Sequence, residues 1–145
     1  MRTTPLPDLA SRLRLDISRM ARRLRQEAGA KLSPSQTAAL ATIERHGPLT
    51  PSELAGRERV QRPTVTRVLA RLEEAGLVDR AADPQDRRSC LVSISGAGSE
   101  LLQAMRDRKD AFLAQRIDAL EPADREALDR AAAILERMLK EGGGR

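Results

Sequence analysis

The sequence predicts a mainly α-helical chain that contains one small β-hairpin. Apolar residues recur every three or four positions near both ends of the chain, as they do along one face of an amphipathic helix. Two helix-start signals, each a Ser or Thr followed by Pro, stand at 33–34 and 50–51. Two short runs, 77–80 and 90–94, flank a charged, turn-forming loop, which is the pattern of a hairpin.

Length and charge limit the possible partners. The chain has 145 residues, enough for one domain with a hydrophobic core and short for two. It carries 26 basic and 21 acidic residues, a net charge of +5, which permits a polyanionic partner. Nearly all the basic residues are Arg, whose planar fork suits phosphates and guanine edges. A codon bias toward Arg is the alternative explanation.

Other residue types argue against several classes of protein. The only aromatic residue is Phe112, which weighs against binding of single strands by base stacking. Cys90 is the only Cys, so no disulfide forms within the chain and a reducing compartment is expected. No apolar run approaches the roughly 18 residues of a membrane span, and the first residues lack the apolar core of a signal peptide. We expect a soluble, cytoplasmic protein.

The first expected element is a helix from Leu6 to near Gly29. Its apolar residues form one stripe: Leu6, Leu9, Leu13, Ile17, Met20 and Leu24. Such a stripe can pack on its own domain or on a second chain. Because the helix is long for the terminus of a small domain, we favour a stripe shared with a partner.

The next two helices have explicit start signals. Residues 33–36 form a capping box with Pro34 at the first helical position, and the helix closes at His46 and Gly47. Thr50 repeats the signal for a very short helix that ends at about 56–57. Two helices in this order, the second very short, are what helix-turn-helix geometry requires.

The third helix of this set starts at 61–64 and is stopped by Gly76. Its expected buried face is Val65, Val68, Leu69 and Leu72, and its opposite face is Gln61, Arg62, Thr64, Arg67 and Arg71. Residues 57–71 hold five Arg and one Glu, a net charge of +4. The positive charge is concentrated at the N-terminal half, the end that a recognition helix presents to the major groove. A merely solvated charged face is the alternative.

The hairpin carries a basic loop at residues 83–88. Arg87 and Arg88 lie there, and basic hairpin tips fit the narrow minor groove of A·T-rich DNA. We expect Asp86 to hold Arg88 in place by an ion pair. A plain exposed turn is the alternative.

Two more helices follow the hairpin. Residues 95–98 cap a long helix, and residues 121–124 break it and start the last one. Residues 100–141 contain eight basic and ten acidic residues, a net charge of −2, whereas residues 1–31 have a net charge of +5. The C-terminal part is therefore expected to be scaffold.

With these elements in order, the sequence resembles the MarR family of bacterial transcription regulators. The matching stretches are 54–55, 64–78, 83–88 and 91–98. The most specific of them is an Asp-x-Arg wing followed by a strand and a Ser-capped helix. The resemblance covers the whole chain, because the terminal helices stand where the family has its dimerisation helices. It implies a winged helix-turn-helix homodimer that binds a pseudo-palindromic operator.

The resemblance also implies residue roles. It places DNA contacts on the third helix and a minor-groove arginine at Arg88, oriented by Asp86. The candidate DNA-binding residues are Ser35, Gln61, Arg62, Thr64, Thr66, Arg67, Arg71, Asp86, Arg87 and Arg88. The candidate dimerisation residues are Leu9, Leu13, Ile17, Leu128, Leu135 and Leu139.

The corresponding division of the chain has three parts within one structural domain. Residues 1–31 and 99–141 form the helical dimerisation region, residues 32–98 form the winged-helix DNA-binding region, and residues 142–145 form a flexible tail.

Family members commonly repress transcription and release DNA when a small phenolic ligand binds between the dimer helices and the winged domain. Others sense peroxide through a Cys in the first helix. This chain has no Cys there, and Cys90 is expected to pack in a wing strand as a small apolar residue. It also has no Tyr or Trp to stack on a phenol, and Pro63 has no N–H to donate to a phosphate. The effector is left open.

An enzyme is not expected, and neither is a cofactor or metal. His46 is the only His, and the sequence has no Gly-rich phosphate loop or metal-ligand cluster. Two alternatives from other classes are a nonspecific architectural DNA binder, which needs phosphate contacts alone, and a winged-helix protein-interaction module, whose surface would be apolar or acidic. Polar Gln61, Thr64 and Thr66 interleaved with Arg favour sequence-specific reading of double-stranded DNA, by a homodimeric repressor.

Overall fold

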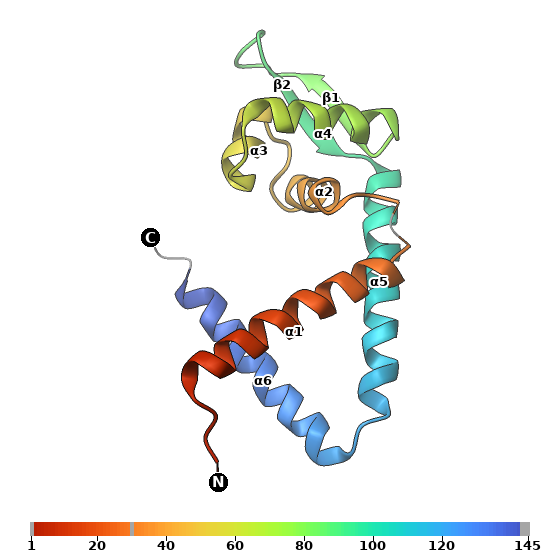
Figure 1. The fold of residues 1–145 in the computed structure, drawn as a ribbon. Helices are drawn as coiled ribbons and strands as arrows, with labels where there is room; N and C mark the ends of the chain where they lie inside the picture. Colours follow the sequence, from red (N-terminus) through yellow and green to blue (C-terminus); the bar gives the residue numbers. More distant parts are fainter. Residues whose placement is uncertain (1, 30, 143–145) are drawn as a thin grey trace. The chain divides into compact units, whose positions relative to one another are not determined.

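Helices make up most of the protein, and a single hairpin interrupts them (Figure 1). The computed structural model describes residues 2–29 and 31–142. The elements in these ranges are α1 (Leu6–Glu27), α2 (Pro34–His46), α3 (Pro51–Glu58), α4 (Arg62–Glu74), β1 (Val78–Ala82), β2 (Cys90–Ile94), α5 (Gly96–Asp118) and α6 (Pro122–Glu141). The predicted mainly helical class with a small hairpin is confirmed. No helix in the described ranges is long and apolar enough to cross a membrane.

The chain separates into two compact units, Met1–Lys109 and Asp110–Arg145, with the division inside α5. The first unit holds α1 to β2 and the first part of α5, and the second holds the rest of α5 and α6. The division of the sequence into dimerisation and DNA-binding regions is a functional one and stays a prediction. Most of the expected tail, residues 143–145, lies outside the described residues.

The helix starts expected from the sequence are confirmed. In the capping box of α2, Ser33 Oγ accepts the N–H of Gln36 at 3.1 Å, and Gln36 Oε1 accepts the N–H of Ser33 at 3.0 Å. Thr50 Oγ1 accepts the N–H of Glu53 at the start of α3, at a distance of 3.1 Å. Ser95 Oγ accepts the N–H of Gly98 at 3.0 Å and so caps α5. These bonds satisfy N–H groups that have no partner inside the helix.

The turn between α3 and α4 is made by a left-handed residue. Arg59 has φ 54° and ψ 44°, and the N–H of Val60 donates to the carbonyl oxygen of Ala55 at 3.1 Å. This arrangement closes α3 at Glu58, slightly later than the expected end at 56–57. The chain then reaches α4 in three residues, 59–61, which gives the short turn of a helix-turn-helix.

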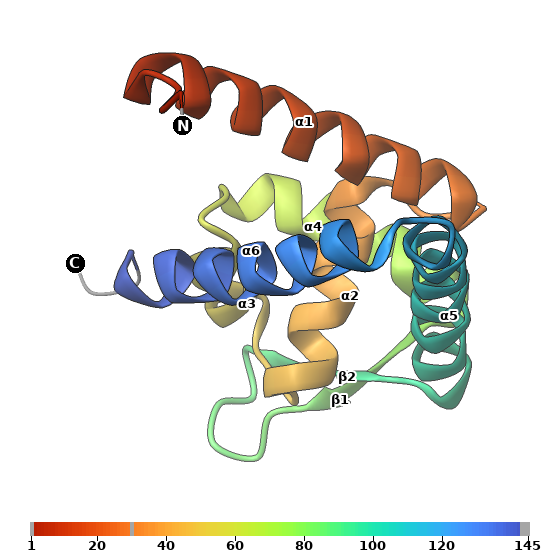
Figure 2. The same ribbon diagram turned by 90° about the horizontal axis from the view of Figure 1, so that it is seen from below.

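The two strands pair in antiparallel register from Val78 opposite Ile94 to Ala82 opposite Cys90. The expected range of the second strand, 90–94, is confirmed, whereas the first strand was expected at 77–80 and runs from 78 to 82. The expected range was wrong because Ala81 and Ala82 are held by their pairing across the hairpin, which their residue types do not indicate. Figure 2 shows the strands running side by side away from the start of α5.

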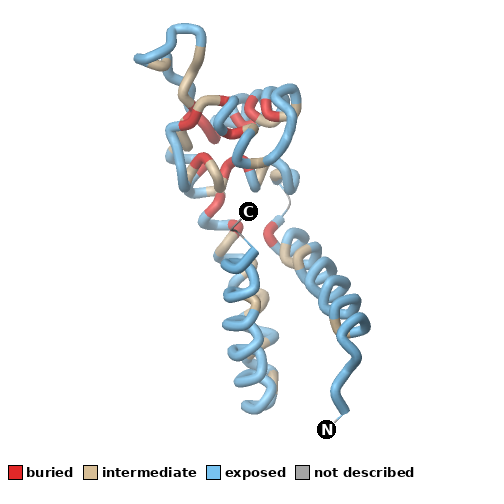
Figure 3. Tube along the Cα trace, turned by 90° about the vertical axis from the view of Figure 1, so that its left-hand side faces the viewer, coloured by how far each residue is buried: buried red, intermediate tan, exposed pale blue. Residues whose placement is uncertain are grey.

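One core holds α2, α3, α4, the hairpin and the start of α5 together. Its most buried side chains are Leu40, Ile43, Leu54, Leu69, Leu72, Val92 and Leu102. The predicted inner face of α4 is confirmed, with Val65, Leu69 and Leu72 buried and Val68 partly buried. Figure 3 shows most of the red, buried segments of the tube gathered in these elements.

The start of α5 lies close to the start of the hairpin. A Cβ at Gly98 would lie 2.2 Å from the carbonyl oxygen of Leu77, so only glycine fits there without a shift of the backbone. Ser95 strengthens the same junction, because its hydroxyl donates to the carbonyl oxygen of Gly76 at 2.7 Å and its N–H donates to that of Leu77 at 3.0 Å. This junction fixes the direction in which the hairpin leaves the core.

Candidate nucleic-acid interface

The apolar face of α4 packs on the core, so its polar face points to solvent. Gln61, Arg62, Thr66, Arg67 and Arg71 are exposed. Thr64 is only partly exposed and lies against apolar side chains of the core side, so it is less accessible than expected. The outer face of α4 therefore presents three arginines, a glutamine and a threonine to solvent.

The N-terminal end of α4 is tied to α3. Arg62 Nη1 donates a hydrogen bond to Ser52 Oγ in the first turn of α3. Thr66 Oγ1 donates to the carbonyl oxygen of Arg62 at 3.1 Å, one turn earlier in the same helix. These bonds hold Arg62 and Thr66 on the same side of α4. Ser52 was not among the residues expected at the site.

A polar hollow of about 360 Å³ joins α4 to the hairpin. Its lining is Pro51, Arg62, Thr66, Leu69, Arg80, Arg88, Ser89 and Cys90. The hollow brings together three of the residues predicted from the sequence, namely Arg62 and Thr66 from α4 and Arg88 from the wing. Arg80 is paired with Glu73, so Arg62 and Arg88 provide the net positive charge of the hollow, which suits an anion such as a phosphate.

Arg80 is a residue of this hollow that sequence reasoning missed. Its Nε lies 2.7 Å from Glu73 Oε2 at the end of α4, and its Nη1 lies 3.6 Å from the sulfur of Cys90. The strand register makes Arg80 and Cys90 diagonal neighbours. The sequence predicted a strand that ends at Arg80, which places this residue near the wing. It did not indicate that Glu73 and Cys90 would be its contacts.

The wing loop, residues 83–89, is closed by a series of hydrogen bonds. Asp83 Oδ1 accepts the N–H of Gln85 at 2.9 Å, and the N–H of Ser89 donates to the carbonyl oxygen of Asp86 at 3.1 Å. Asp86 Oδ1 accepts the backbone N–H of Arg88 at 3.0 Å. Each aspartate thus closes a turn two residues long.

The expected ion pair between Asp86 and Arg88 is not found among the described residues. Asp86 holds the backbone of Arg88 instead of its guanidinium group. In a turn, an aspartate carboxylate reaches the backbone N–H two residues later in the chain with little strain, so this bond forms instead of the ion pair. Arg87 and Arg88 are both exposed.

The other sequence-predicted DNA-binding residues do not line the polar hollow. Ser35 is exposed at the start of α2 and lines a separate, mostly apolar cavity together with Thr64. Gln61, Arg67, Arg71 and Arg87 are exposed but do not line the hollow. The structure therefore groups Arg62, Thr66 and Arg88, and distributes the other candidates around them or apart from them.

Cys90 is half-buried and packs against the hydrophobic core, as expected. His46 is exposed in the last turn of α2. Within residues 2–29 and 31–142, no cluster of three or more His, Cys, Asp or Glu residues could hold a metal ion.

A larger cavity of about 610 Å³ lies between α1, α2 and the first part of α5. Its lining includes the apolar residues Leu24, Leu32 and Met105 and the basic residues Arg22, Arg25 and Lys109. A pocket with apolar walls and several cations suits a small organic anion.

Comparisons with known proteins agree with this arrangement. Residues 32–90, from before α2 to the first residue of β2, match the MarR family. An HTH-type transcriptional regulator of Mycobacterium bovis is 42% identical over 92% of this chain and 94% of its own length. The HTH-type transcriptional repressor NicR of Pseudomonas putida is 32% identical over 55% of this chain and 51% of its own length.

Solved structures share the fold over nearly the whole chain. A transcriptional regulator from Pseudomonas aeruginosa has a TM-score of 0.84 at 34% identity and covers 95% of this chain and 98% of its own. A mutant of MepR from Staphylococcus aureus, solved bound to an oligodeoxyribonucleotide, has a TM-score of 0.71 at 22% identity and covers 97% of this chain and 99% of its own. Sequence and fold together show that the chain belongs to the MarR family of winged helix-turn-helix transcriptional regulators, which are not enzymes and bind DNA, typically as dimers.

Proposed function

We propose that the protein is a homodimeric repressor that binds a pseudo-palindromic operator with sequence specificity. The observation that carries this proposal is the polar hollow, where Arg62 and Thr66 of α4 meet Arg88 of the wing. One helix and one hairpin that share a basic surface can contact adjacent grooves of one duplex.

On this proposal α4 lies in the major groove. Its exposed Gln61, Thr66 and Arg67 provide the side-chain types that read base edges, since Gln pairs with adenine and Arg with guanine through two hydrogen bonds each. Arg62 is held by Ser52 and is suited to a phosphate contact that sets the register of the helix.

The wing is proposed to enter the neighbouring minor groove. Arg88 is exposed, and the turn that Asp86 closes fixes its backbone. A narrow minor groove concentrates negative potential, so an arginine inserted there contributes to specificity for A·T-rich DNA. Arg87 is the second cation of the same loop.

The homodimer is proposed from the exposed apolar stripes of the terminal helices. On α1, Leu13 is 40% exposed and Ile17 is 50% exposed, and on α6 Leu128 is 48% exposed and Leu139 is 78% exposed. Neither helix has a fully buried residue. Amphipathic helices that expose this much apolar surface bury it against a partner. Leu9 and Leu135 are partly buried and belong to the same two stripes.

Two-fold symmetry would then set the form of the operator. Two recognition helices about 34–36 Å apart reach successive major grooves on one side of the duplex, which calls for two inverted half-sites. Repression follows when such a complex covers a promoter, and the relative NicR is named as a repressor.

We also propose that a small organic anion releases the DNA. The support is the cavity between α1, α2 and α5, which offers Arg22, Arg25 and Lys109 to a negative group. Because its walls come both from α1 and from α2, an occupant would contact the proposed dimer helix and the DNA-binding region together. The described lining contains no aromatic residue, so the proposed ligand would be held by the cations and the apolar walls rather than by ring stacking.

A gel-shift titration on the DNA upstream of the protein's own gene, with random DNA as competitor, tests the proposal. We expect a discrete complex that survives competition. Equal, salt-sensitive smearing on every DNA would contradict sequence specificity and support an architectural role. Absence of binding to any duplex would instead support a protein-interaction module.

A further inference from the structure

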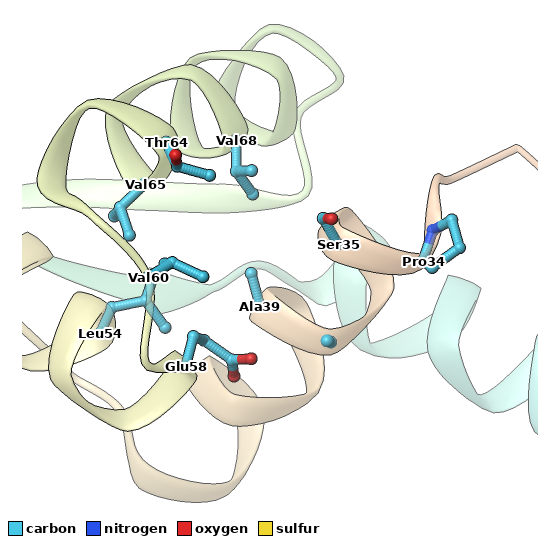
Figure 4. Close-up of a pocket in the computed structure, with 10 residues that line it drawn as sticks. Pro34, Ser35, Ala39, Leu54, Glu58, Val60, Thr64, Val65 and Val68 are labelled. Carbon is cyan, nitrogen blue, oxygen red and sulfur yellow. The ribbon is translucent and has the colours of Figure 1, made fainter.

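A third cavity lies beneath the recognition helix, on the side opposite the DNA-reading face. It has a volume of about 290 Å³ and is bordered by α2, α3, α4 and the turn between α3 and α4 (Figure 4). We propose that this cavity is a binding site for a small lipophilic ammonium ion. The lining residues are Pro34, Ser35, Ala38, Ala39, Leu54, Glu58, Val60, Thr64, Val65 and Val68.

The walls of the cavity are mainly apolar. Leu54 comes from α3, Val65 and Val68 come from the inner face of α4, and Ala39 comes from α2 (Figure 4). Val60 is 40% exposed although it lines the cavity, so it stands where the cavity meets solvent. Ligand sites commonly combine such walls with a few polar groups, and at about 290 Å³ this cavity lies just below their usual range of roughly 300–1,000 Å³, which limits it to a small ligand.

Glu58 makes the cavity negatively charged. Among the described lining residues it is the only charged one, and Figure 4 shows its carboxylate turned toward α2 rather than out along α3. Thr42 Oγ1 donates a hydrogen bond to Glu58 Oε1, which holds the group in place. No partner for Glu58 Oε2 is found among the described residues. A half-buried carboxylate with one oxygen available suits an ammonium group beside an apolar body.

The other two cavities strengthen the assignment by contrast. The polar hollow at the wing is lined by Arg62, Arg80 and Arg88, and the cavity behind α1 is lined by Arg22, Arg25 and Lys109. The cations that line those two sites repel a small cation, whereas the cavity under α4 offers it a carboxylate. The cavity under α4 therefore selects ligands of the opposite charge from the other two.

The direct test is a methyl NMR titration of the full-length protein with three probes of the same shape: benzylammonium, benzyl alcohol and benzoate. We expect benzylammonium to shift the methyl signals of Leu54, Val60, Val65 and Val68 in a saturable way. Benzyl alcohol should bind about tenfold more weakly, and benzoate should give no saturable shift at these methyls. No saturable shift with benzylammonium, or equal shifts with all three probes, would overturn the proposal.

Two variants make the test specific. Glu58→Gln removes the charge but keeps an oxygen that can accept the bond from Thr42, and it should weaken benzylammonium binding about tenfold. Glu53→Gln is the matched control, because it removes the same charge from the same helix outside the cavity, and it should bind as the parent does. Val60→Phe should abolish binding by filling the cavity from its exposed edge. Unchanged binding by Glu58→Gln would refute the role of the carboxylate.

Discussion

Single residues of the wing show how a turn can position a cation. Asp86 accepts the backbone N–H of Arg88, so the carboxylate fixes the direction of the chain and leaves the guanidinium group to other partners. In an ion pair, by contrast, the carboxylate would compete with DNA for the same cation. The observed geometry thus combines a defined backbone with a side chain that can reach a groove.

Replacing Arg88 tests the contact itself. Arg88→Ala should weaken operator binding about tenfold and leave the melting temperature unchanged, because the side chain is exposed. Fluorescence anisotropy with a labelled operator measures the affinity. Arg45→Ala is the matched control, since it removes an exposed arginine from the end of α2 and should not affect affinity. Equal binding by parent and Arg88→Ala would refute the role of the wing.

Replacing Asp86 separates its two possible roles. Asp86→Asn keeps a side-chain oxygen that can accept the N–H of Arg88, so operator affinity should stay within about twofold of the parent. Asp86→Ala removes the acceptor, and the looser wing should bind about tenfold more weakly. The same anisotropy titration serves both variants. An Asn variant as weak as the Ala variant would show that the negative charge, and not the turn, matters.

At the scale of elements, the junction between the hairpin and α5 decides where the wing points. Gly98 lies against the carbonyl oxygen of Leu77, and Ser95 bonds to both Gly76 and Leu77. The sheet also gains a third short segment, because Leu49 and Val92 exchange backbone hydrogen bonds at 3.0 and 2.7 Å. The hairpin is therefore anchored at its base, while its loop is held only by its own turns.

A methyl group added at Gly98 should disturb this junction. Gly98→Ala should lower the free energy of unfolding by about 1–3 kcal/mol, because the backbone of Leu77 must move. Gly56→Ala in α3 is the matched control. Its added Cβ would meet nothing within 4 Å, so the substitution should raise the free energy of unfolding by about 0.5–1 kcal/mol. Urea denaturation followed by circular dichroism measures both. Unfolding free energies that rise alike in Gly98→Ala and in the control would contradict the tight junction.

At the scale of the whole molecule, the elements from α2 to the start of α5 share a buried core, but α1 and α6 do not have one of their own. The core elements share one buried cluster, whereas α1 and α6 contain no fully buried residue. Isolated helices gain little stability from propensity alone, so these two need a surface to pack on. A second copy of the chain is the partner that we propose.

Leu13→Asp should weaken this dimer. A carboxylate in a buried interface is costly, so the dimer dissociation constant should rise at least about tenfold, and operator affinity should fall with it. Leu15→Asp is the matched control, because Leu15 is equally exposed at 40% but lies outside the apolar stripe. Analytical ultracentrifugation measures both variants. An unchanged dimer in Leu13→Asp would remove this residue from the interface.

Local features of the structure could be predicted from the sequence. The caps at Ser33, Thr50 and Ser95 link residues that are three apart, and the apolar face of α4 repeats with the period of a helix. Such features depend on neighbours along the chain, and the residue types alone specify them. The candidate residues Arg62 and Arg88 were found from such patterns, whereas Thr66 was placed by the resemblance to the MarR family.

Features that join distant parts of the chain were decided only by the tertiary structure. The strand register placed Arg80 beside Cys90, and the packing of α4 on the hairpin brought Glu73 to Arg80. The fold of the wing turned Asp86 toward a backbone N–H, and the packing of α2 on α3 left Glu58 at an apolar cavity. The physical reason is that these contacts depend on how elements pack, and many packings are compatible with the same local pattern. By itself, then, the sequence determined the elements and the family, whereas the tertiary structure decided which side chains meet and what charge each cavity carries.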